Sequence, residues 1–351
     1  MATATQRLKF LEEAAIAAGI DIGIKDKHSQ ASIPTDFTTF ASGCQIKSGM
    51  EYVPFRLYDY QVELNKLIDR YPKLIIFKTR QLGASELIGC KMFHRSCLNR
   101  AYSGVVLSIG QDESSKISER IQNMPTFNGF QWEYQSSRRV KPVGGGNIYF
   151  RPSTDNAARS LPSVNDILID EADFIPNADK IYSAATPSQK MAGDKAQIFI
   201  VSTISEKGEF GWFGQLFSKY NPDGIDYLDR IQKIRRGEGE YGAGFDWWID
   251  ETGWCKVLMH WRSHPIYSFI PDFLEKTKRD ERLSDDQLQR EYNLGIELIQ
   301  ANEKPYNRFN PVLHVLKGRD LSIATYNPSL PLHISLRSMT IAVASSTPPF
   351  M

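Results

Sequence analysis

Short apolar runs alternate with helical stretches through the middle of the chain, and this alternation constrains the fold more than any other feature. The runs lie at residues 74–77, 104–108, 148–150, 167–169 and 198–201. Short apolar strands that are separated by helices are typical of a mostly parallel sheet with helices on both faces. The sequence therefore predicts an α/β fold. Folds of this kind bind ligands at the carboxyl ends of their strands.

The composition describes a globular chain with no strong overall charge. Of the 351 residues, 41% are hydrophobic and 24% are charged, as in most packed proteins. Because 42 Lys and Arg residues balance 41 Asp and Glu residues, the net charge of +1 creates no overall field that would attract nucleic acid or a membrane. Any such partner must bind to a local patch. No apolar run approaches the ~18 to 20 residues of a membrane span, so we expect neither export nor membrane insertion.

Residues 78–85, Lys-Thr-Arg-Gln-Leu-Gly-Ala-Ser, follow an apolar run and begin a helical stretch, which is the context of a P-loop. In the usual motif, G-x-x-x-x-G-K-[ST], backbone N–H groups hold the phosphates, the lysine reaches them and the hydroxyl binds Mg²⁺. Gly83 and Ser85 match this pattern, but Lys78 replaces the first glycine and Ala84 replaces the lysine. Lys78 and Arg80 are then the cations that could contact the γ phosphate. A simple glycine turn between strand and helix is the alternative.

Two adjacent carboxylates, Asp170 and Glu171, follow the apolar run 167–169. This is the pattern of a Walker B motif, in which the first carboxylate helps to hold Mg²⁺ and the second polarises the attacking water. A helix N-cap would explain one of these acids but not the pair after an apolar strand.

Two further polar sites fit the same interpretation. Ser202 and Thr203 follow the run 198–201, where ATPases that couple hydrolysis to movement have a polar group that senses the γ phosphate. A helix cap is the other explanation of these hydroxyls. Gln61 lies about one helix before the P-loop strand, where its amide could recognise the adenine edge or simply lie on a helix surface.

Together these segments resemble the large terminase subunit of tailed bacteriophages, the ATPase motor that packs DNA into a procapsid. The resemblance covers roughly residues 50 to 300. It rests on the Arg-Gln-Leu-Gly loop at 80–83 and on Pro54-Phe55-Arg56-Leu57 with Gln61, Ala158-Arg159-Ser160, Asp170-Glu171-Ala172, Ser202-Thr203, His260-Trp261 and Arg290-Glu291-Tyr292. It implies a P-loop NTPase fold of the RecA or ASCE kind.

The resemblance also implies roles for individual residues, with ATP and Mg²⁺ as cofactors. Gln61 would contact adenine, Ser85 and Asp170 would hold Mg²⁺, and Glu171 would be the base. Ser202 and Thr203 would couple hydrolysis to DNA movement. The phosphate site would be formed by Lys78, Thr79, Arg80, Gln81, Leu82, Gly83, Ala84, Ser85 and Glu86. Catalysis would also involve Arg80 and Arg159, the latter resembling an arginine that completes a neighbouring subunit's site.

We expect four regions along the chain. These are a lead-in segment at 1–50, the P-loop ATPase core at 51–225, a small helical and aromatic-rich subdomain or lid at 226–303, and a linker with the truncated start of an RNase H-like nuclease domain at 304–351. After Glu303 only Asp320 is acidic, whereas two-metal cleavage needs clustered carboxylates. We therefore expect no nuclease activity.

The partners that the resemblance implies are double-stranded DNA, bound without sequence preference, a portal protein and a small terminase subunit. A homo-oligomeric ring would assemble transiently on the procapsid in the cytoplasm of the bacterial host. Two basic clusters could contact DNA phosphates or could be ordinary solvated faces. They are Arg138-Arg139 with Lys141, and Lys233 with Arg235-Arg236.

Two other functions fit parts of the sequence. The literal Asp-Glu-Ala-Asp at 170–173 suggests a superfamily 2 helicase of the DEAD-box kind, but Gly-Lys-Thr is missing from the P-loop and fewer than 150 residues follow Thr203. Because the usual P-loop lysine is absent, a nucleotide-binding scaffold without turnover is the third possibility.

Overall fold

The structure is a computed structural model that describes residues 32–154, 163–190, 193 and 196–297. The predicted arginine finger, Arg159, lies outside the described residues. So do most of the expected lead-in segment and the whole of the expected linker and nuclease start at 304–351.

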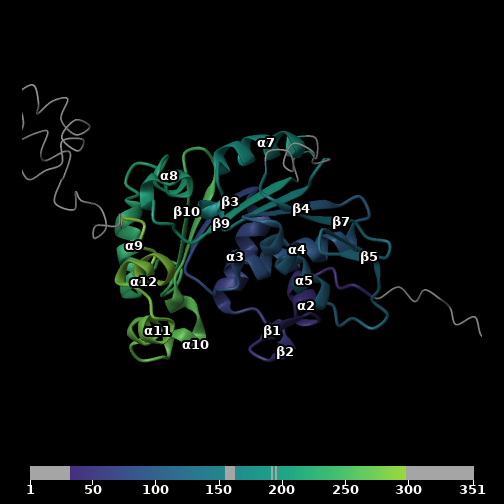
Figure 1. The fold of residues 1–351 in the computed structure, drawn as a ribbon, viewed down its shortest axis with the longest axis horizontal. Coiled ribbons are helices and arrows are strands. Elements are labelled where there is room, and N and C mark those ends of the chain that lie inside the picture. Colours follow the sequence, from purple (N-terminus) through teal and green to yellow (C-terminus); the bar gives the residue numbers. More distant parts are fainter. Residues whose placement is uncertain (1–31, 155–162, 191–192, 194–195, 298–351) are drawn as a thin grey trace, which may run out of the picture. The chain divides into compact units, whose positions relative to one another are not determined.

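A nine-stranded sheet forms the centre of the described chain (Figure 1). The six strands from β11 to β7 are parallel, while β10, β6 and β5 are antiparallel to their neighbours. All five predicted apolar runs form parallel strands of this sheet. The spatial order is β10 (Phe245–Ile249), β11 (Cys255–Met259), β3 (Lys73–Lys78), β9 (Gln197–Ser202), β8 (Asp166–Asp170), β4 (Ser103–Ser108), β7 (Asn147–Pro152), β6 (Arg139–Pro142) and β5 (Trp132–Ser136).

The strand order brings the predicted motifs to one edge of the sheet. β9 lies between β3, which precedes the P-loop, and β8, which carries Asp170. The parallel register pairs Phe77 with Ser202 and Asp170 with Val201, so the carboxyl ends of these three strands meet. A strand inserted between the strand of the predicted P-loop and that of the predicted Walker B motif is the arrangement of RecA-like P-loop NTPases. The predicted fold class is confirmed.

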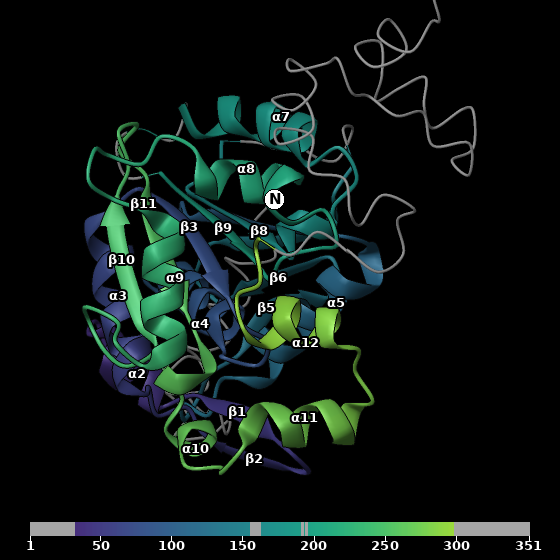
Figure 2. The same cartoon turned by 90° about the vertical axis from the view of Figure 1, so that its left-hand side faces the viewer.

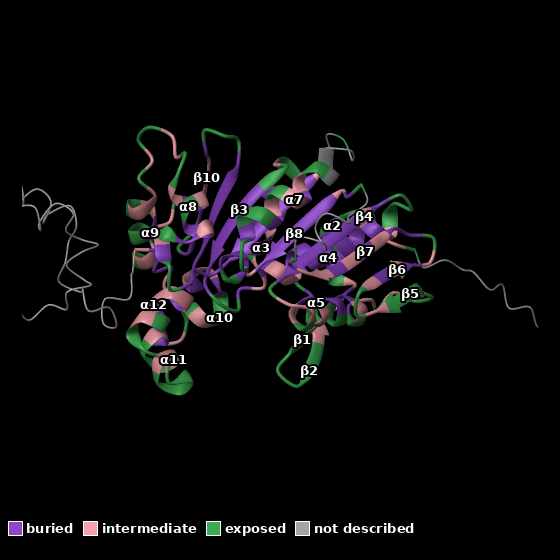
Figure 3. Cartoon of the chain, turned by 45° about the horizontal axis from the view of Figure 1, so that its top comes forward, coloured by how far each residue is buried: buried purple, intermediate pink, exposed green. Residues whose placement is uncertain are grey.

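Helices cover both faces of the sheet, because successive side chains of a strand point to opposite faces. Leu74 and Ile76 pack in one core with α3, α4 and α5, whereas Ile75 and Phe77 pack in a second core with α7, α8 and α9. Figure 3 shows the central strands buried. Burial on both faces explains why these strands are continuous apolar runs. The helices are α3 (Asp59–Arg70), α4 (Ala84–Leu98), α5 (Gln111–Asn123), α7 (Ala178–Lys190), α8 (Trp212–Ser218) and α9 (Tyr227–Arg236).

The core begins before residue 50, where the sequence placed the start of the ATPase region. Helix α2 (Phe37–Ser42) packs on α4, with the rings of Phe40 and Phe93 centred 5.2 Å apart. The hairpin of β1 (Gln45–Ser48) and β2 (Glu51–Pro54) follows. Residues 37–50 therefore belong to the packed α/β core region rather than to a lead-in.

The tryptophan-rich segment also differs from the prediction, because it does not form a subdomain of its own. β10 and β11 extend the central sheet, with β11 parallel to β3, and α9 lies along β10 (Figure 2). Only the helices that follow form a small separate core, made by Trp261, Phe273, Leu288 and Tyr292. Those helices are α10 (Pro265–Ser268), α11 (Phe273–Glu281) and α12 (Asp285–Tyr292).

Three short 3-10 turns complete the described elements: η1 (Ala172–Phe174), η2 (Gly208–Phe210) and η3 (Trp261–Ser263). Within the described ranges, no helix combines the length and the apolar character needed to cross a bilayer.

Candidate active site

The predicted phosphate loop connects β3 to α4 at the carboxyl edge of the sheet. Gly83 has φ +68° and Gln81 has φ +61°, both in the left-handed region. A Cβ atom on Gly83 would lie 2.8 Å from Nε2 of Gln61, so only glycine fits there without displacing that amide. The 15-residue helix α4 begins directly after Gly83. Its first N–H groups have no acceptor within the helix and provide the usual anion site of a helix N-terminus.

Gln61 supports this loop from behind. Its Nε2 donates to the carbonyl of Leu82 at 3.4 Å, and its Oε1 accepts from the backbone N–H of Tyr58 at 3.1 Å. The hydroxyl of Tyr60 donates to the same Leu82 carbonyl at 2.9 Å. Gln61 is only 4% exposed, so both ends of its amide are used inside the chain. Contact with adenine stays a prediction, and the observed bonds give Gln61 a different task.

Three other residues of the loop have side chains that are turned into the core. The side chains of Thr79, Leu82 and Ala84 are buried. The backbone N–H of Thr79 donates to the carbonyl of Met259 at 2.9 Å, which ties the loop to β11. Ala84, at the position of the usual lysine, lies in the core that also contains α3.

The displaced lysine meets the predicted base. Lys78 Nζ lies 2.8 Å from Oε1 of Glu171, and the two side chains are 7% and 33% exposed. Burial acts to raise the pKa of Glu171, but the charge and the hydrogen bond of Lys78 outweigh it and lower that pKa. Glu171 is therefore held as a carboxylate. Its backbone has φ +50°, and this strained conformation turns the residue away from the line of β8.

Ser85 and Asp170 form the predicted metal pair. Ser85 Oγ donates to Oδ1 of Asp170 at 2.5 Å, between the first turn of α4 and the end of β8. Burial and the neighbouring charge of Glu171 raise the pKa of Asp170, so a positive charge beside this carboxylate would be favourable. A hydroxyl and a carboxylate are the oxygen ligands that Mg²⁺ prefers, and the donor set fits that ion.

The hydroxyls after β9 lie on either side of the turn that follows β8. Thr203 approaches Glu171, with its backbone N and its Oγ1 each 3.5 Å from Oε2. Ser202 Oγ instead accepts from the backbone N–H of Asp173 at 3.1 Å. The structure thus brings Thr203 to the proposed base and uses Ser202 to hold the turn.

Arg80 is engaged by a helix far along the chain. Its Nη1 lies 2.7 Å from Oε2 of Glu291 in α12, and its backbone N–H donates to the Glu291 carbonyl at 2.8 Å. The tyrosyl hydroxyl of Tyr267 donates to Oε1 of Gln81 at 3.3 Å. Sequence reasoning missed these contacts, although Arg290-Glu291-Tyr292 was part of the family resemblance. On the other side of the loop, Arg120 donates to Glu86 at 3.0 Å.

The basic clusters considered for DNA are largely paired within the chain. Lys141 pairs with Glu133, and Nε of Arg139 donates to Asn147 at 2.9 Å. Each cation of the second cluster also has an acidic partner: Lys233 with Asp229, Arg235 with Glu297 and Arg236 with Glu238. Because these partners lie within the chain, contact of the two clusters with DNA phosphates stays a prediction.

No family model and no curated protein matches this sequence. Several solved structures have a similar fold. The large terminase ATPase domain of a Thermus phage aligns over 68% of this chain and 94% of its own, at 15% identity and a TM-score of 0.49. These structural neighbours are phage large terminases.

Two further neighbours are longer chains. The large terminase of a thermophilic bacteriophage in complex with ADP aligns over 67% of this chain and 52% of its own, at 11% identity and a TM-score of 0.46. The HK97 bacteriophage large terminase aligns over 74% and 54%, at 11% identity and a TM-score of 0.48. The chain spans about half the length of these two. At such low identities the function has to be argued from the chemistry of the site.

Proposed function

We propose that this chain is an ATPase motor subunit that hydrolyses ATP to move double-stranded DNA into a bacteriophage procapsid. One observation carries the ATPase part. The carboxylate of Glu171 lies 2.8 Å from Lys78, while Asp170 beside it bonds Ser85 of the phosphate loop. Two strands that are distant in sequence, β3 and β8, and the first turn of α4 thus supply a cation, two acids and a hydroxyl to one edge of the sheet, as phosphoryl transfer requires.

In this proposal the phosphates of ATP bind at the N-terminus of α4, in reach of Lys78. Mg²⁺, held by Ser85 and Asp170, would neutralise phosphate charge when bound. Glu171 is an ionised acceptor that orients the attacking water and takes up its proton as the water oxygen bonds to the γ phosphorus. The bond from the γ phosphorus to the bridging oxygen breaks, and ADP and phosphate leave.

Thr203 is the proposed link from hydrolysis to movement. Its N–H and hydroxyl both face Oε2 of Glu171 at 3.5 Å. A change in the charge or position of the Glu171 carboxylate would therefore alter the contacts at the end of β9. Ser202 takes part by holding the turn that carries Asp173.

The cargo and partners come from the sequence resemblance to phage large terminases. They are double-stranded DNA, a portal protein, a small terminase subunit and further copies of this chain in a ring on the procapsid. Contacts of a translocating motor would go to DNA phosphates and would be independent of sequence.

Arg159 is proposed to complete the site of a neighbouring subunit. Arg159→Ala should bind ATP normally, hydrolyse none alone and poison mixed rings, because such an arginine contributes ~10³ to 10⁵ in rate. Wild-type activity in a monomeric preparation, unchanged by the substitution, would contradict a role in trans.

Steady-state ATP hydrolysis by the purified chain, with and without DNA and procapsids, tests the proposal. A motor should hydrolyse ATP faster when procapsids and DNA are present. A helicase should instead separate the strands of a labelled duplex, and a scaffold should bind ATP without turnover. Glu171→Gln in the same assay shows whether the measured activity belongs to this site.

A further inference from the structure

Asp173, the last residue of the Asp-Glu-Ala-Asp sequence, has no part in the chemistry described so far. It lies in η1, two residues after the proposed base, and is 6% exposed. Its Oδ2 accepts from the backbone N–H of Ser205 at 2.7 Å, and its Oδ1 accepts from that of Phe213 at 3.3 Å. Both donors belong to the segment that follows β9.

The same segment packs tightly around this carboxylate. A Cβ atom on Gly211 would lie 2.6 Å from Oδ1 of Asp173. The backbone of residue 211 therefore lies so close to the carboxylate that only glycine fits there. The backbone N–H of Asp173 donates to Oγ of Ser202 at 3.1 Å. Asp173 is therefore bonded to both ends of the segment 202–213.

Burying an aspartate at this position costs folding free energy unless its carboxylate oxygens accept hydrogen bonds. In the described part of the chain, Asp173 forms no ion pair, and its partners are backbone N–H groups. A carboxylate accepts from such groups on both oxygens and bonds them more strongly than a neutral side chain does. An amide of the same shape can offer only one acceptor and would turn its NH₂ group toward one of the two donors.

The bonds of Asp173 to Ser202, Ser205 and Phe213, here called the Asp173 clamp, also bear on the position of the proposed base. Thr203 lies between Ser202 and Ser205, the residues that Asp173 holds, and its N–H and hydroxyl face Glu171 at 3.5 Å. We propose that Asp173 is a positioning residue, which fixes the segment after β9 so that Thr203 keeps Glu171 aligned for hydrolysis. The inference rests on the proposed ATPase function.

Asp173→Asn is the primary test. The kcat of ATP hydrolysis should fall by at least ~10-fold, a fraction of the ~10² to 10⁴ that an aligned base contributes, while KM for ATP changes less than about threefold. Asp179→Asn, an exposed aspartate of α7, is the matched control and should hydrolyse ATP like the wild type. A merely structural role for Asp173 would lower the amount of folded protein and would leave kcat per active site unchanged.

A double substitution shows whether Asp173 acts through Thr203. If it does, Asp173→Asn with Thr203→Ala should be no slower than the slower of the two single variants, whereas independent effects would multiply. Should Asp173→Asn fail to fold, Ser202→Ala removes the other bond of the clamp, and its kcat should fall with KM unchanged.

The outcomes separate this inference from the proposed function. An inactive wild-type chain would overturn the ATPase assignment itself. An active wild type with an equally active Asp173→Asn, or with effects at Asp173 and Thr203 that multiply, would overturn only the positioning role.

Discussion

Nζ of Lys78 and Oε1 of Glu171 lie 2.8 Å apart, so the cation that replaces the usual P-loop lysine is also the counter-ion of the proposed base. Lys78 is the last residue of β3 and Glu171 follows β8, so the two side chains meet across the strand β9 that lies between them. A γ phosphate that forms an ion pair with Lys78 must compete with the Glu171 carboxylate for the lysine ammonium group. The charge state of Glu171 and the occupancy of the phosphate site are thereby connected.

Lys78→Met should shift the pH dependence of hydrolysis as well as lower its rate. Lys78 lowers the pKa of Glu171 and keeps it ionised. Without the cation that pKa rises, so the acid limb of the kcat profile should move to higher pH. Lys78→Arg, which retains the charge, is the control and should leave the limb near its original position. If the acid limb of Lys78→Met stays at the wild-type pH, Lys78 does not control the ionisation of the proposed base.

Glu171→Gln should bind ATP but hydrolyse it at least ~10²-fold more slowly, because the carboxylate orients water and accepts its proton. The phosphates are held by other groups, so the affinity for a fluorescent ATP analogue should stay within a few-fold of the wild type. Hydrolysis within threefold of the wild type would rule out Glu171 as the base.

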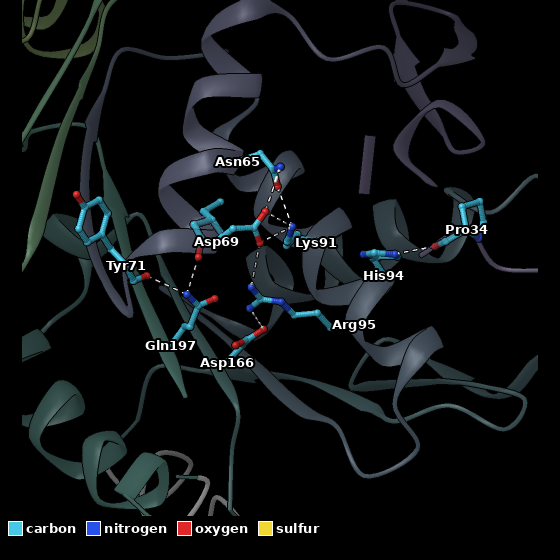
Figure 4. Close-up of polar contacts among 10 residues, drawn as sticks. Pro34, Asn65, Asp69, Tyr71, Lys91, His94, Arg95, Asp166 and Gln197 are labelled. Atoms are coloured by element: carbon cyan, nitrogen blue, oxygen red, sulfur yellow. Dashed lines mark hydrogen bonds and ion pairs between the residues drawn. The ribbon is translucent and has the colours of Figure 1, made fainter. Parts of the chain in front are cut away.

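Arg95→Met should strongly destabilise the fold at the opposite edge of the sheet. Asp166, at the start of β8, is 1% exposed and accepts from Arg95 Nη1 and from the hydroxyl of Tyr102, each at 2.7 Å. Figure 4 shows Arg95 between Asp69 and Asp166. Removing Arg95 leaves the buried Asp166 carboxylate without its cation and with the Tyr102 hydroxyl as the remaining one of these two donors, which should cost about 1 to 3 kcal/mol.

Chemical denaturation of Arg95→Met measures this cost. The control is Lys66→Met, which breaks the exposed pair of Lys66 with Glu63 and should change the free energy of unfolding by less than ~1 kcal/mol. Equal effects of the two substitutions would show that the Arg95 pair has no special weight.

Buried His260 should make the fold sensitive to acid. Its Nε2 donates to Oδ1 of Asn293 at 3.0 Å, and its Nδ1 accepts from the backbone N–H of Arg262 at 3.5 Å, so the neutral ring is satisfied. Burial lowers the pKa of His260 from 6.5 to about 3, against the opposing effect of the hydrogen bond that the ring donates to Asn293. The unfolded chain therefore binds the proton first, and stability that is fully present above pH 6.5 is lost as the pH falls toward 3.

At pH 5 this loss amounts to about 2 kcal/mol, the free-energy equivalent of a histidine titrating near 6.5 only in the unfolded chain. The comparison is with His260→Gln, which cannot be protonated. Between pH 7 and pH 5 the wild type should lose more unfolding free energy than the variant by that amount. Parallel pH profiles of the two proteins would contradict the assignment.

The sequence identified the parts of the site that depend on local pattern. The apolar runs became parallel strands because both of their faces are buried, and residues at their carboxyl ends then had to converge. Lys78, Ser85, Asp170, Glu171 and Thr203 do so.

Contacts between distant elements could not be predicted in this way. β11 joins the sheet although Lys256 interrupts its apolar run. Pairing between residues that are 181 positions apart leaves no periodic signal in the sequence. The pair of Arg80 with Glu291 spans 211 residues for the same reason. The direction of Gln61 depends on how α3 docks behind the loop, which its own sequence does not encode.

The position of β11 beside β3 has a consequence for how the protein is made. β3 is complete once residue 78 has been synthesised, but its neighbours β9 and β11 lie at residues 197–202 and 255–259. At about 5 to 20 residues per second, the ribosome needs on the order of ten seconds or more to supply them. During that interval an apolar strand has unpaired edges, which invite pairing with other nascent chains. The proposed nucleotide site can therefore assemble only late in translation, and until then the strand that carries its lysine has unpaired edges.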